Sequence, residues 1–556
     1  MLLQLLRFFR EEAIGPKLLI FGMSLASGLS RGLLLAVINA AAEQTMTGET
    51  SHGYALLFIL LLSFHLGSDY YGRVRISRMV EGMIQRLRLR VCGKLLYTEL
   101  RFIEGRDKGE LYTRLVHDIN AVSGLAPTLL GAFQGAMLLA FSLIYIGWLS
   151  PMGMIMTIVA MIAGASAYLL RNKSAIADFH RLVAKQAEFF GSIDAMLGGF
   201  KELRIGRAKR NDIMADTADI SHEYRDLKIK REKIFAVDSL ASQLSMFGLI
   251  AIVVFVLPLL FSSELPYRDT TVIFQLLAAI LFLVGPMETV VSSIPSVTQS
   301  KVSMDNIQGL ERDLDAAIAD QENRAADVVP MGFDTIELDN LFFRYDSPQG
   351  DDAFEVGPIT LDIRRGERLF IVGGNGSGKT TLLKLLTGLY VPVSGAIRVN
   401  GNTVENKDYQ AYREMFTTIF SDFYLFSRLY GIADIDGDEI HSLLRRFELD
   451  KKTRYRDGGF TSIDLSTGQR KRLAYISCYL ENRQIYVFDE LAADQDPAFR
   501  KFFYDTLLPE LKAAGKTIIT ITHDDHYFHA CDRLIKMDYG KIERQVIASG
   551  NGTVSI

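Results

Sequence analysis

Long apolar runs alternate with charged segments through the first part of the chain. Six runs approach or exceed the length needed to cross a bilayer, about 20 mostly apolar residues per helix, and they fall at residues 18–38, 54–70, 125–147, 152–170, 240–262 and 271–297. The charged segments between them are long and helix-compatible. The pattern therefore predicts a membrane all-α domain of six transmembrane helices with long extensions, over residues 1–310.

After residue 310 the pattern changes twice. The charged stretch ERDLDAAIADQENRAAD, from Glu311 to Asp327, lacks a wide apolar stripe and predicts a helical linker over residues 311–332. From residue 333 to residue 556, short β-branched runs alternate with helical segments, which is typical of an α/β domain. We expect a membrane all-α domain fused to an α/β domain.

Lysine and arginine are distributed unevenly between the loops. Residues 73–114 and 171–233 are dense in both, whereas the loops near Glu43, Pro151 and Pro266 carry very few. Because positively charged loops stay on the cytoplasmic side of a membrane, both termini are expected in the cytoplasm. The two basic segments are interpreted as helices that continue beyond the bilayer. The alternative, separate soluble insertions, is disfavoured because neither segment has turn clusters or a core of its own.

Composition agrees with a membrane protein and excludes other classes. The hydrophobic fraction is 49%, and the formal net charge of −4 gives no basic surplus, so a nucleic-acid partner has no electrostatic support. Cys92, Cys478 and Cys531 lie far apart without a CxxC spacing. They indicate neither a disulfide framework nor a zinc site.

A glycine-rich loop follows the strand-like run from Leu369 to Val372. It reads GGNGSGKTT and matches the phosphate-binding pattern GxxxxGK[ST]. Glycines let the backbone curl closely enough for its N–H groups to converge on a polyphosphate at a helix N-terminus. Lys379 is expected to reach the β- and γ-phosphates of ATP, and Thr380 to offer a hydroxyl to Mg²⁺. The nucleotide-binding set predicted here is Gly373, Gly374, Asn375, Gly376, Ser377, Gly378, Lys379, Thr380 and Thr381.

Two acids end a second apolar strand, Ile485 to Phe488. Asp489 and Glu490 would then lie at the carboxyl end of a parallel strand, where such sheets bind ligands. Asp489 is expected to hold Mg²⁺, usually through water, and Glu490 to act as general base on the attacking water. The alternative is an ordinary transition from a strand to a loop, which the upstream phosphate loop disfavours.

The segment LSTGQ, followed by the basic residues RKR, lies between these two elements. Together with them it resembles the ATP-binding domain of ABC transporters. The resemblance implies that this signature contacts the γ-phosphate of an ATP held by the other subunit, through Ser466 and Gly468. Gln469 is counted in the same nucleotide-binding set. With one phosphate loop and one signature in the chain, a complete site would need a second copy of the chain.

The same resemblance assigns three further residues. Tyr345 in FFRY is implied to stack on adenine, Asp496 in AADQD to lie in the D-loop at the nucleotide, and His523 in ITITHDD to contact the γ-phosphate. A lone histidine after a strand is usually structural, and this constellation favours the catalytic role. The run His523 to His526 also resembles a metal site, which is disfavoured because adjacent residues alternate faces.

One marker of the family is missing. Its ATP-binding domains carry a Mg²⁺-contacting glutamine about forty residues after the phosphate loop, where this chain reads TTIFSDFYLF. Ser421 occupies that place with Asp422 beside it. Asp422 is the better metal ligand on charge grounds and is predicted to replace the glutamine.

Three segments resemble the bacterial exporters of cyclic peptides such as lasso-peptide antibiotics and siderophore precursors. They are FSDFYLF, DELAADQDPAFRKFFYDTLLP and THDDHYFHACDRL. The resemblance implies a homodimer in the bacterial inner membrane that exports a compact peptide at the expense of ATP and Mg²⁺. A lipid or lipopeptide flippase of the same fold is the alternative. A non-transporting ABC receptor or channel regulator is disfavoured, because it would typically show a degraded site.

Two charged residues lie inside predicted membrane helices. Arg31 falls in the run 18–38 and Glu288 in the run 271–297, just after Gly285 and Pro286. Ionisable groups at such depth usually face a bundle interior or an aqueous cavity. Both residues are therefore candidates for a cargo path, at depths too different for a direct ion pair; alternatively, each satisfies a neighbouring helix.

Overall fold

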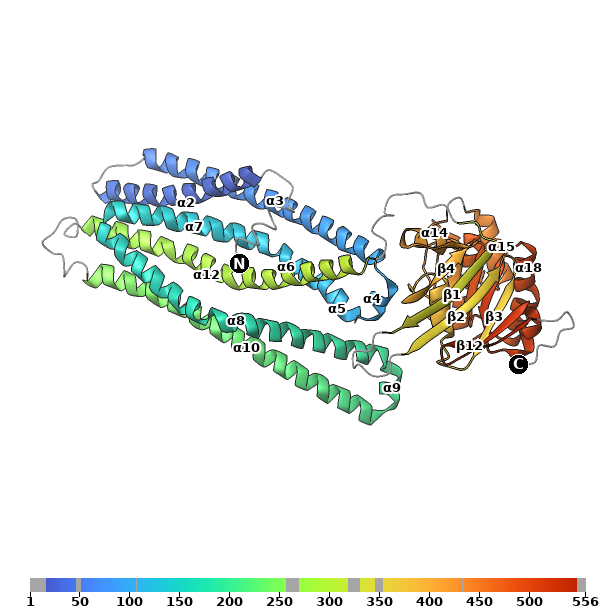
Figure 1. The fold of residues 1–556 in the computed structure, drawn as a ribbon. Coiled ribbons are helices and arrows are strands. Elements are labelled where there is room, and N and C mark those ends of the chain that lie inside the picture. Colours follow the sequence, from blue (N-terminus) through green and yellow to red (C-terminus); the bar gives the residue numbers. More distant parts are fainter. Residues whose placement is uncertain are drawn as a thin grey trace. The chain divides into compact units, whose positions relative to one another are not determined.

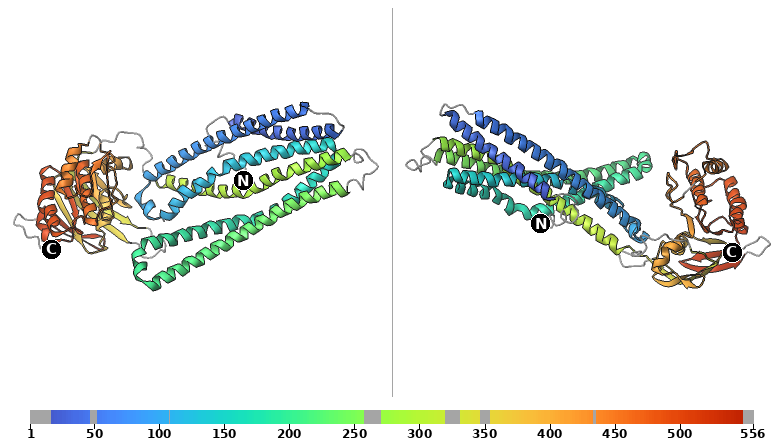
Figure 2. Two further views of the ribbon diagram at one scale, coloured as in Figure 1. Left: turned by 180° about the vertical axis from the view of Figure 1, so that it is seen from behind. Right: turned by 90° about the horizontal axis from the view of Figure 1, so that it is seen from above.

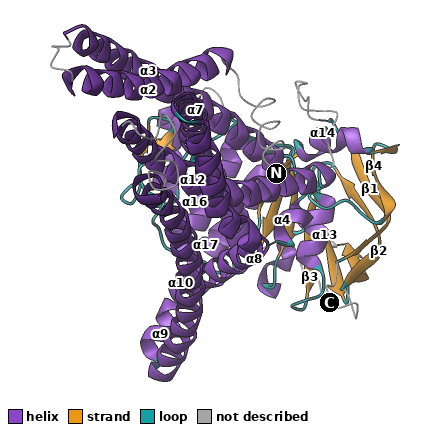
Figure 3. Ribbon diagram, turned by 90° about the vertical axis from the view of Figure 1, so that its left-hand side faces the viewer, coloured by secondary structure: helices purple, strands orange, loops and turns teal. Residues whose placement is uncertain are grey.

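In the computed structural model the chain forms two compact units. Figure 1 colours the ribbon along the sequence, and Figure 3 colours helices purple and strands orange. The first unit comprises residues 1–98 and 103–317, and the second comprises residues 99–102 and 318–556. The structure describes residues 17–46, 52–106, 108–256, 270–318, 331–345, 354–432 and 435–547.

The first unit is helical throughout its described residues. Its main helices are α2 (Lys17–Met46), α3 (His52–Leu96), α7 (Leu125–Leu149), α8 (Pro151–Gly198), α10 (Arg207–Ala251) and α12 (Thr270–Ala316). Shorter elements are α4 (Leu100–Glu104), shared between the units, α5 (Lys108–Tyr112), α6 (Ile119–Ser123) and α9 (Phe200–Ile205), with π-helical turns η1 (Thr113–Asp118) and η2 (Ile252–Val256). Helices α8 and α10 pack along each other, and Figures 1 and 2 show this pair diverging from the other helices toward α9.

Among the described residues, five helices are long and apolar enough to cross a membrane. They cover Leu18–Thr45, His52–Leu96, Arg114–Leu149, Arg207–Val256 and Thr271–Ala316. The sixth expected span, residues 152–170, lies in α8, where the apolar helix found among the described residues is the shorter Pro151–Gly164. The end of the span expected at 240–262 lies outside the described residues. The predicted count of six is therefore not confirmed.

Small side chains allow these helices to approach closely. At Gly32 of α2, an added Cβ would lie only 2.2 Å from the ring of Phe141 on α7. A glycine is thus required for this contact, as is common where apolar helices pack in a membrane. Polar contacts supplement the packing: Ser27 Oγ of α2 lies 3.1 Å from His65 Nδ1 of α3.

The linker predicted at 311–332 begins inside a helix of the first unit. Residues 311–316 are the last part of α12 and form ion pairs with α3. Arg90 Nε lies 2.7 Å from Glu311 Oε1, and Lys94 Nζ lies 2.7 Å from Asp315 Oδ2 and 3.6 Å from Glu311 Oε1. The charges that indicated a linker therefore serve as contacts between helices. Residues 319–330 lie outside the described part.

The described residues of the second unit form three sheets. The six-stranded sheet has the order β12-β11-β3-β10-β9-β6, with every neighbouring pair parallel except β11 and β12. Its strands are β3 (Arg368–Gly373), β6 (Phe416–Ile419), β9 (Ile485–Asp489), β10 (Thr517–Ile521), β11 (Arg533–Asp538) and β12 (Lys541–Ile547). The antiparallel sheet β2-β1-β4-β5 uses β1 (Thr335–Arg344), β2 (Glu355–Arg364), β4 (Ser394–Val399) and β5 (Asn402–Thr403), and β7 (Tyr455–Arg456) pairs with β8 (Gly459–Phe460).

Helices accompany these sheets. They are α13 (Lys379–Leu386), α14 (Tyr409–Arg413), α15 (Gly437–Arg446), α16 (Thr467–Glu481), α17 (Pro497–Phe502) and α18 (Leu508–Ala513), with the short turns η3 (Asn406–Asp408), η4 (Phe503–Leu507) and η5 (Asp525–Ala530). Strands β9 and β10 are buried along their whole length, as expected of parallel strands covered on both faces. The prediction of a helical membrane domain fused to an α/β domain is confirmed.

Candidate functional site

The phosphate loop joins β3 to α13 and depends on its glycines. Gly373 has φ +153° and Gly378 has φ +94°, conformations that side-chain-bearing residues rarely adopt. A Cβ at Gly373 would also lie 2.3 Å from the carbonyl oxygen of Met537. The backbone can therefore curl at the start of α13 as the sequence predicted, with its N–H groups available to an anion.

Lys379 and Ser377 both fit a phosphate ligand. Lys379 Nζ donates to the carbonyl oxygens of Gly373 at 3.0 Å and Gly374 at 2.9 Å. Burial lowers the pKa of Lys379, against the opposing effect of the carboxylates Glu490 and Asp489. The hydroxyl of Ser377 is buried and has no hydrogen-bond partner among the described residues. Anionic phosphate oxygens would give both groups acceptors.

Asp489 at the end of β9 faces the first turn of α13. Thr380 Oγ1 donates to Asp489 Oδ2 at 3.1 Å. Burial raises the pKa of Asp489, while hydrogen bonds from Thr380 and from the backbone and hydroxyl of Ser421 oppose the rise. A carboxylate beside a hydroxyl is the hard oxygen environment that Mg²⁺ prefers. Among the described residues no three His, Cys, Asp or Glu side chains gather as a metal site, so phosphate oxygens and water would have to complete the coordination.

Ser421, rather than Asp422, contacts the acid at this site. Within the described chain Asp422 is exposed and makes no hydrogen bond or ion pair, whereas the backbone and hydroxyl of Ser421 act to lower the pKa of Asp489. The preference for Asp422 rested on charge alone, and charge does not determine which of two adjacent residues points inward. The geometry favours Ser421 at the place of the missing glutamine.

Glu490 and His523 lie at the ends of neighbouring parallel strands. Glu490 follows β9 and His523 follows β10 by one further residue, and His523 Nε2 lies 3.1 Å from Glu490 Oε1. Glu490 adopts φ +53°, and its N–H donates to the Ile521 carbonyl at 3.1 Å. Positive φ is uncommon for a residue with a Cβ and is often found at functional sites. Both side chains remain partly accessible to solvent.

The signature segment begins α16. Ser466 is its N-cap, and Ser466 and Gln469 form a reciprocal capping box in which each side chain accepts from the other's backbone N–H. Gly468 offers its carbonyl to Gln495 Nε2 at 2.9 Å. In the described part of the chain no hydrogen bond joins these three signature residues to the phosphate loop.

Asp496 is engaged locally. It is the N-cap of α17, its Oδ1 accepts from the Phe499 N–H at 2.9 Å, and its Oδ2 pairs with Arg472. The hydrogen bond from Phe499 is the largest cause of a lowered pKa for Asp496. The carboxylate predicted to lie at the nucleotide is thus already used to fix the turn after Glu490.

Tyr345 lies beside the phosphate-binding helix. Its hydroxyl is 3.0 Å from Thr381 Oγ1, and its ring packs edge-on against Phe343 and Tyr390. The structure therefore brings together two residues, Tyr345 and Thr381, that the sequence assigned to the same nucleotide from distant segments.

Sequence reasoning missed the cluster behind the signature. Lys471, Arg472 and Gln495 join α16 to the loop after Glu490. The motif RKR marked only a basic run there, and such runs are usually solvent-exposed. That Lys471 is 4% exposed could not be read from its neighbours.

The membrane unit contains a cavity of about 350 Å³ between α10 and α12. Polar lining residues include Ser239, Gln243, Glu288 and Thr289, beside apolar residues of both helices. Arg31 lies elsewhere, with its guanidinium carbon 5.8 Å from the centroid of the Phe282 ring on α12. In the described structure Arg31 and Glu288 form no ion pair with each other.

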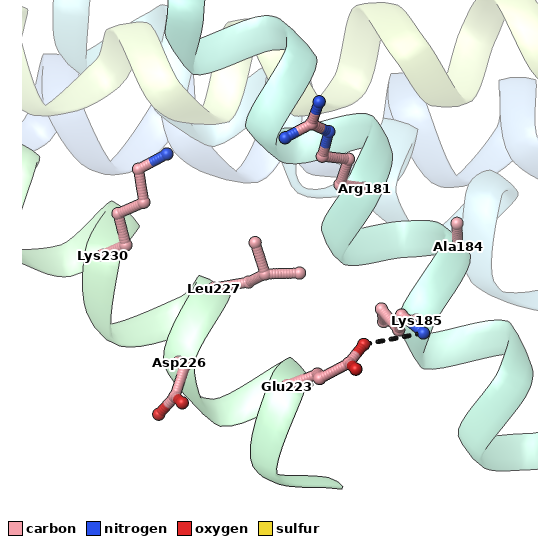
Figure 4. A pocket seen from close by; sticks show the side chains of 7 residues that line it. All are labelled: Arg181, Ala184, Lys185, Glu223, Asp226, Leu227 and Lys230. Carbon is pink, nitrogen blue, oxygen red and sulfur yellow. Dashed lines mark ion pairs between the residues drawn. The ribbon is translucent and has the colours of Figure 1, made fainter. Parts of the chain in front are cut away.

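A second hollow lies between α8 and α10, in the charged part of both helices. Figure 4 shows Lys185 of α8 pointing toward Glu223 of α10. Lys185 Nζ lies 2.8 Å from Glu223 Oε2. Hydrogen bonds to Glu188 and Glu223 raise the pKa of Lys185. Another pair across the same helices joins Lys230 Nζ to Asp178 at 3.0 Å. These pairs indicate a contact between helices rather than a cargo site.

The two halves of the chain match two known families. Residues 356–493 match the family described as "ABC transporter", and residues 18–284 match "ABC transporter transmembrane region". The "ATP-binding protein SyrD" of Pseudomonas syringae pv. syringae is 33% identical over 544 residues, which are 95% of this chain and 94% of that protein. The chain belongs to the ABC transporter family. Its ATP-binding domain makes it an ATPase-driven, multi-pass membrane transporter.

More distant relatives of this ABC transporter agree on its architecture. The "ATP-dependent lipid A-core flippase" of Haemophilus ducreyi is 24% identical, over 89% of this chain and 86% of that protein. Among solved structures, that of a bacterial Atm1-family ABC exporter with ATP bound matches with a TM-score of 0.77 at 18% identity, over 95% of this chain and 93% of that one. The fold is that of an ABC exporter, with one membrane domain and one ATP-binding domain in a single chain.

Proposed function

We propose that this ABC transporter is a homodimer that hydrolyses ATP to export a compact, cyclic or otherwise constrained peptide. The observation that carries the proposal is the pairing of Glu490 with His523, 3.1 Å apart, behind an intact phosphate loop. A channel regulator or receptor without transport would have no need of this hydrolytic arrangement. The peptide cargo is supported by the resemblance of three segments to cyclic-peptide exporters.

Each site residue has a part in hydrolysis. The loop from Gly373 to Ser377 binds the β- and γ-phosphates through its N–H groups, and Lys379 exchanges its carbonyl partners for phosphate oxygens. Tyr345 stacks on adenine. Thr380 and Asp489 would hold Mg²⁺, with Ser421 orienting Asp489, and the ion would supply positive charge at the β- and γ-phosphates when bound.

Glu490 takes a proton from the attacking water as general base. His523 lies within hydrogen-bond distance of the same carboxylate and can contact both the water and the γ-phosphate. Both groups act on one side of the nucleotide, so the opposite side needs donors from elsewhere. The signature residues Ser466, Gly468 and Gln469 of a second copy would supply them, with Asp496 fixing the loop beside them.

Two features support the second copy. The signature has no hydrogen bond to its own phosphate loop in the described chain, although the motif is intact. At the turn between the diverging helices α8 and α10, Leu197, Phe200 and Ile205 are 71%, 62% and 89% exposed. Apolar residues grouped at one tip are typical of a surface that another protein covers.

The cavity at Glu288 supports a polar cargo. It combines hydroxyl and amide groups with apolar walls, as small-ligand sites do, and its carboxylate favours cargo that carries an amino or guanidino group. Outward movement of such cargo requires the ATP-bound and ATP-free states to bind it with different affinity. The chain is expected to lie in the bacterial inner membrane with both termini in the cytoplasm.

A lipid or lipopeptide flippase is the second candidate, supported by the lipid A-core flippase relatives. A flippase would present its cargo site to the lipid phase, and its ATPase activity would respond to lipid composition. A peptide exporter would respond to soluble cyclic peptide at constant lipid composition.

The test is peptide-stimulated ATPase activity of the full chain in lipid nanodiscs. We expect cyclic peptides bearing one lysine to stimulate turnover. Glu288→Gln should raise the half-stimulating concentration about five- to tenfold and leave basal activity within about twofold, by loss of one ion pair in a partly dry site. Glu43→Gln, an acid outside this cavity, is the matched control. An unchanged half-stimulating concentration in Glu288→Gln would remove this residue from the cargo site.

A further inference from the structure

Lys471 is a buried lysine on the signature helix. It lies two residues after Gln469 on α16 and is 4% exposed. Its ammonium donates to the carbonyl oxygen of Glu490 at 2.8 Å and pairs with Asp494 Oδ2, also at 2.8 Å. Burying an ammonium is costly unless it is paired and hydrogen-bonded. The side chain is therefore held in one place by the loop that follows β9.

That loop is the one that aims the Glu490 carboxylate. Glu490 has φ +53°, and its N–H donates a hydrogen bond to the carbonyl oxygen of Ile521 at 3.1 Å. Its carbonyl accepts two hydrogen bonds, from the Ala493 N–H at 3.2 Å and from Lys471. A left-handed residue with a Cβ persists only where its surroundings determine it. Of the hydrogen bonds that hold Glu490 in this conformation, the one from Lys471 has a charged donor. Charge-assisted hydrogen bonds are stronger than hydrogen bonds between neutral groups.

We propose that Lys471 is a positioning residue for ATP hydrolysis. Its ammonium holds the Glu490 peptide in the left-handed turn and so keeps the carboxylate beside His523. Because its ammonium contacts the Glu490 carbonyl and Asp494, it would act through Glu490 and not directly on the water or the nucleotide. The inference rests on the proposed role of Glu490 as general base and adds to it the residue that orients the base.

The same contact connects two sites. Lys471 lies on the helix that starts with the signature, and a parallel link joins Gly468 to Gln495 at 2.9 Å. In the proposed homodimer, the signature of one chain meets the ATP held by its partner, whereas Glu490 acts on the ATP of its own chain. If α16 moves when its signature binds the partner's ATP, the position of the Glu490 carboxylate beside its own chain's ATP would therefore change.

The first experiment measures ATPase turnover and nucleotide affinity of Lys471→Met in the full chain in nanodiscs. Methionine keeps the length of the unbranched apolar part of the side chain but removes the donor and the charge. We expect kcat to fall at least tenfold while the Kd for a fluorescent ATP analogue stays within twofold. Lys471→Arg should recover part of the activity. Asp494→Asn, which leaves the bond to Glu490 in place, should cost less than threefold.

The second experiment repeats Lys471→Met in a Glu490→Gln background. A residue that acts only through Glu490 has nothing left to position, so residual turnover should change less than twofold. Wild-type kcat in Lys471→Met, or a further tenfold loss in the double variant, would overturn the proposal. A parallel loss of ATP affinity in both Lys471 variants would also overturn it, because it would indicate structural damage. Wild-type turnover in Glu490→Gln alone would instead refute the proposed role of the base.

Discussion

His523 Nε2 lies 3.1 Å from Glu490 Oε1, across the ends of two parallel strands that are adjacent in the sheet. In sequence the two residues are 33 positions apart. The register of β10 against β9, which pairs Ile521 with Asp489, brings them together. The same sheet edge carries the phosphate loop after β3, next to β10. Parallel strand order thus gathers a base, a histidine and a phosphate-binding loop in one place.

Replacing the base should separate binding from turnover. We expect Glu490→Gln to bind ATP with wild-type affinity and to lose about a hundredfold or more of kcat, because general-base catalysis contributes roughly 10²–10⁴-fold. Phosphate release and binding of a fluorescent nucleotide measure the two quantities. Turnover close to that of the wild type would show that another group activates the water.

The two candidates for the missing glutamine can be distinguished by metal titration. Ser421→Ala should raise the Mg²⁺ concentration for half-maximal ATPase about two- to fivefold, since it removes one hydrogen bond to Asp489 and leaves the backbone bond. Asp422→Ala should stay within twofold, because its side chain has no partner in the described structure. The reverse order of effects would restore Asp422 to the metal site.

Shared ATP sites predict complementation between two inactive chains. Lys379→Ala damages the phosphate loop and Ser466→Arg the signature, so a tethered mixed dimer has one site with both lesions and one intact site. We expect about half of wild-type ATPase activity, against almost none for either tethered mutant homodimer. A mixed dimer no more active than those controls would argue against sites that are shared and independent.

An ion cluster at the base of the six-stranded sheet should make the second unit sensitive to acid. Burial alone would raise the pKa of Asp532, but hydrogen bonds from Arg368 and Lys512 hold it below its usual 3.8. Because the pKa of Asp532 is lower in the folded than in the unfolded state, its ionised carboxylate stabilises the fold above about pH 4. This stabilisation is lost as the pH falls through the pKa of Asp532 in the folded state.

Asp532→Asn should therefore destabilise the second unit by roughly 1.5–3 kcal/mol at pH 7, the usual range for hydrogen bonds to a charged group. The difference from wild type should shrink as the pH approaches 3. Calorimetric unfolding of the full chain between pH 7 and pH 3 measures it, with Asp525→Asn on the exposed turn η5 as control. A difference that is constant with pH would exclude the ionised carboxylate as its source.

How far the sequence predicted the site depended on the kind of signal. The phosphate loop, the acids after β9 and the signature could be located because glycine spacing and a buried apolar strand are local patterns. Ser421 could not be distinguished from Asp422, since the choice depends on which way a loop turns after β6. Lys471 gave no signal, because its burial depends on the loop from Glu490 to Asp494 folding back onto α16.

The fold shows the same division. Apolar runs predicted the membrane helices. Residues 311–316 of the predicted helical linker belong to α12, where Glu311 and Asp315 form ion pairs with α3 that the sequence did not indicate. Charge along a sequence indicates exposure on average. It does not show whether an opposite charge from a distant segment lies beside it.

The most direct test of the whole account is ATP-driven accumulation of a labelled cyclic peptide in inside-out proteoliposomes, with lipid translocation followed in the same vesicles and Glu490→Gln as the control. We predict peptide accumulation at least tenfold above the control and lipid translocation equal to it. ATP-dependent lipid translocation without peptide accumulation would contradict the account and identify a flippase.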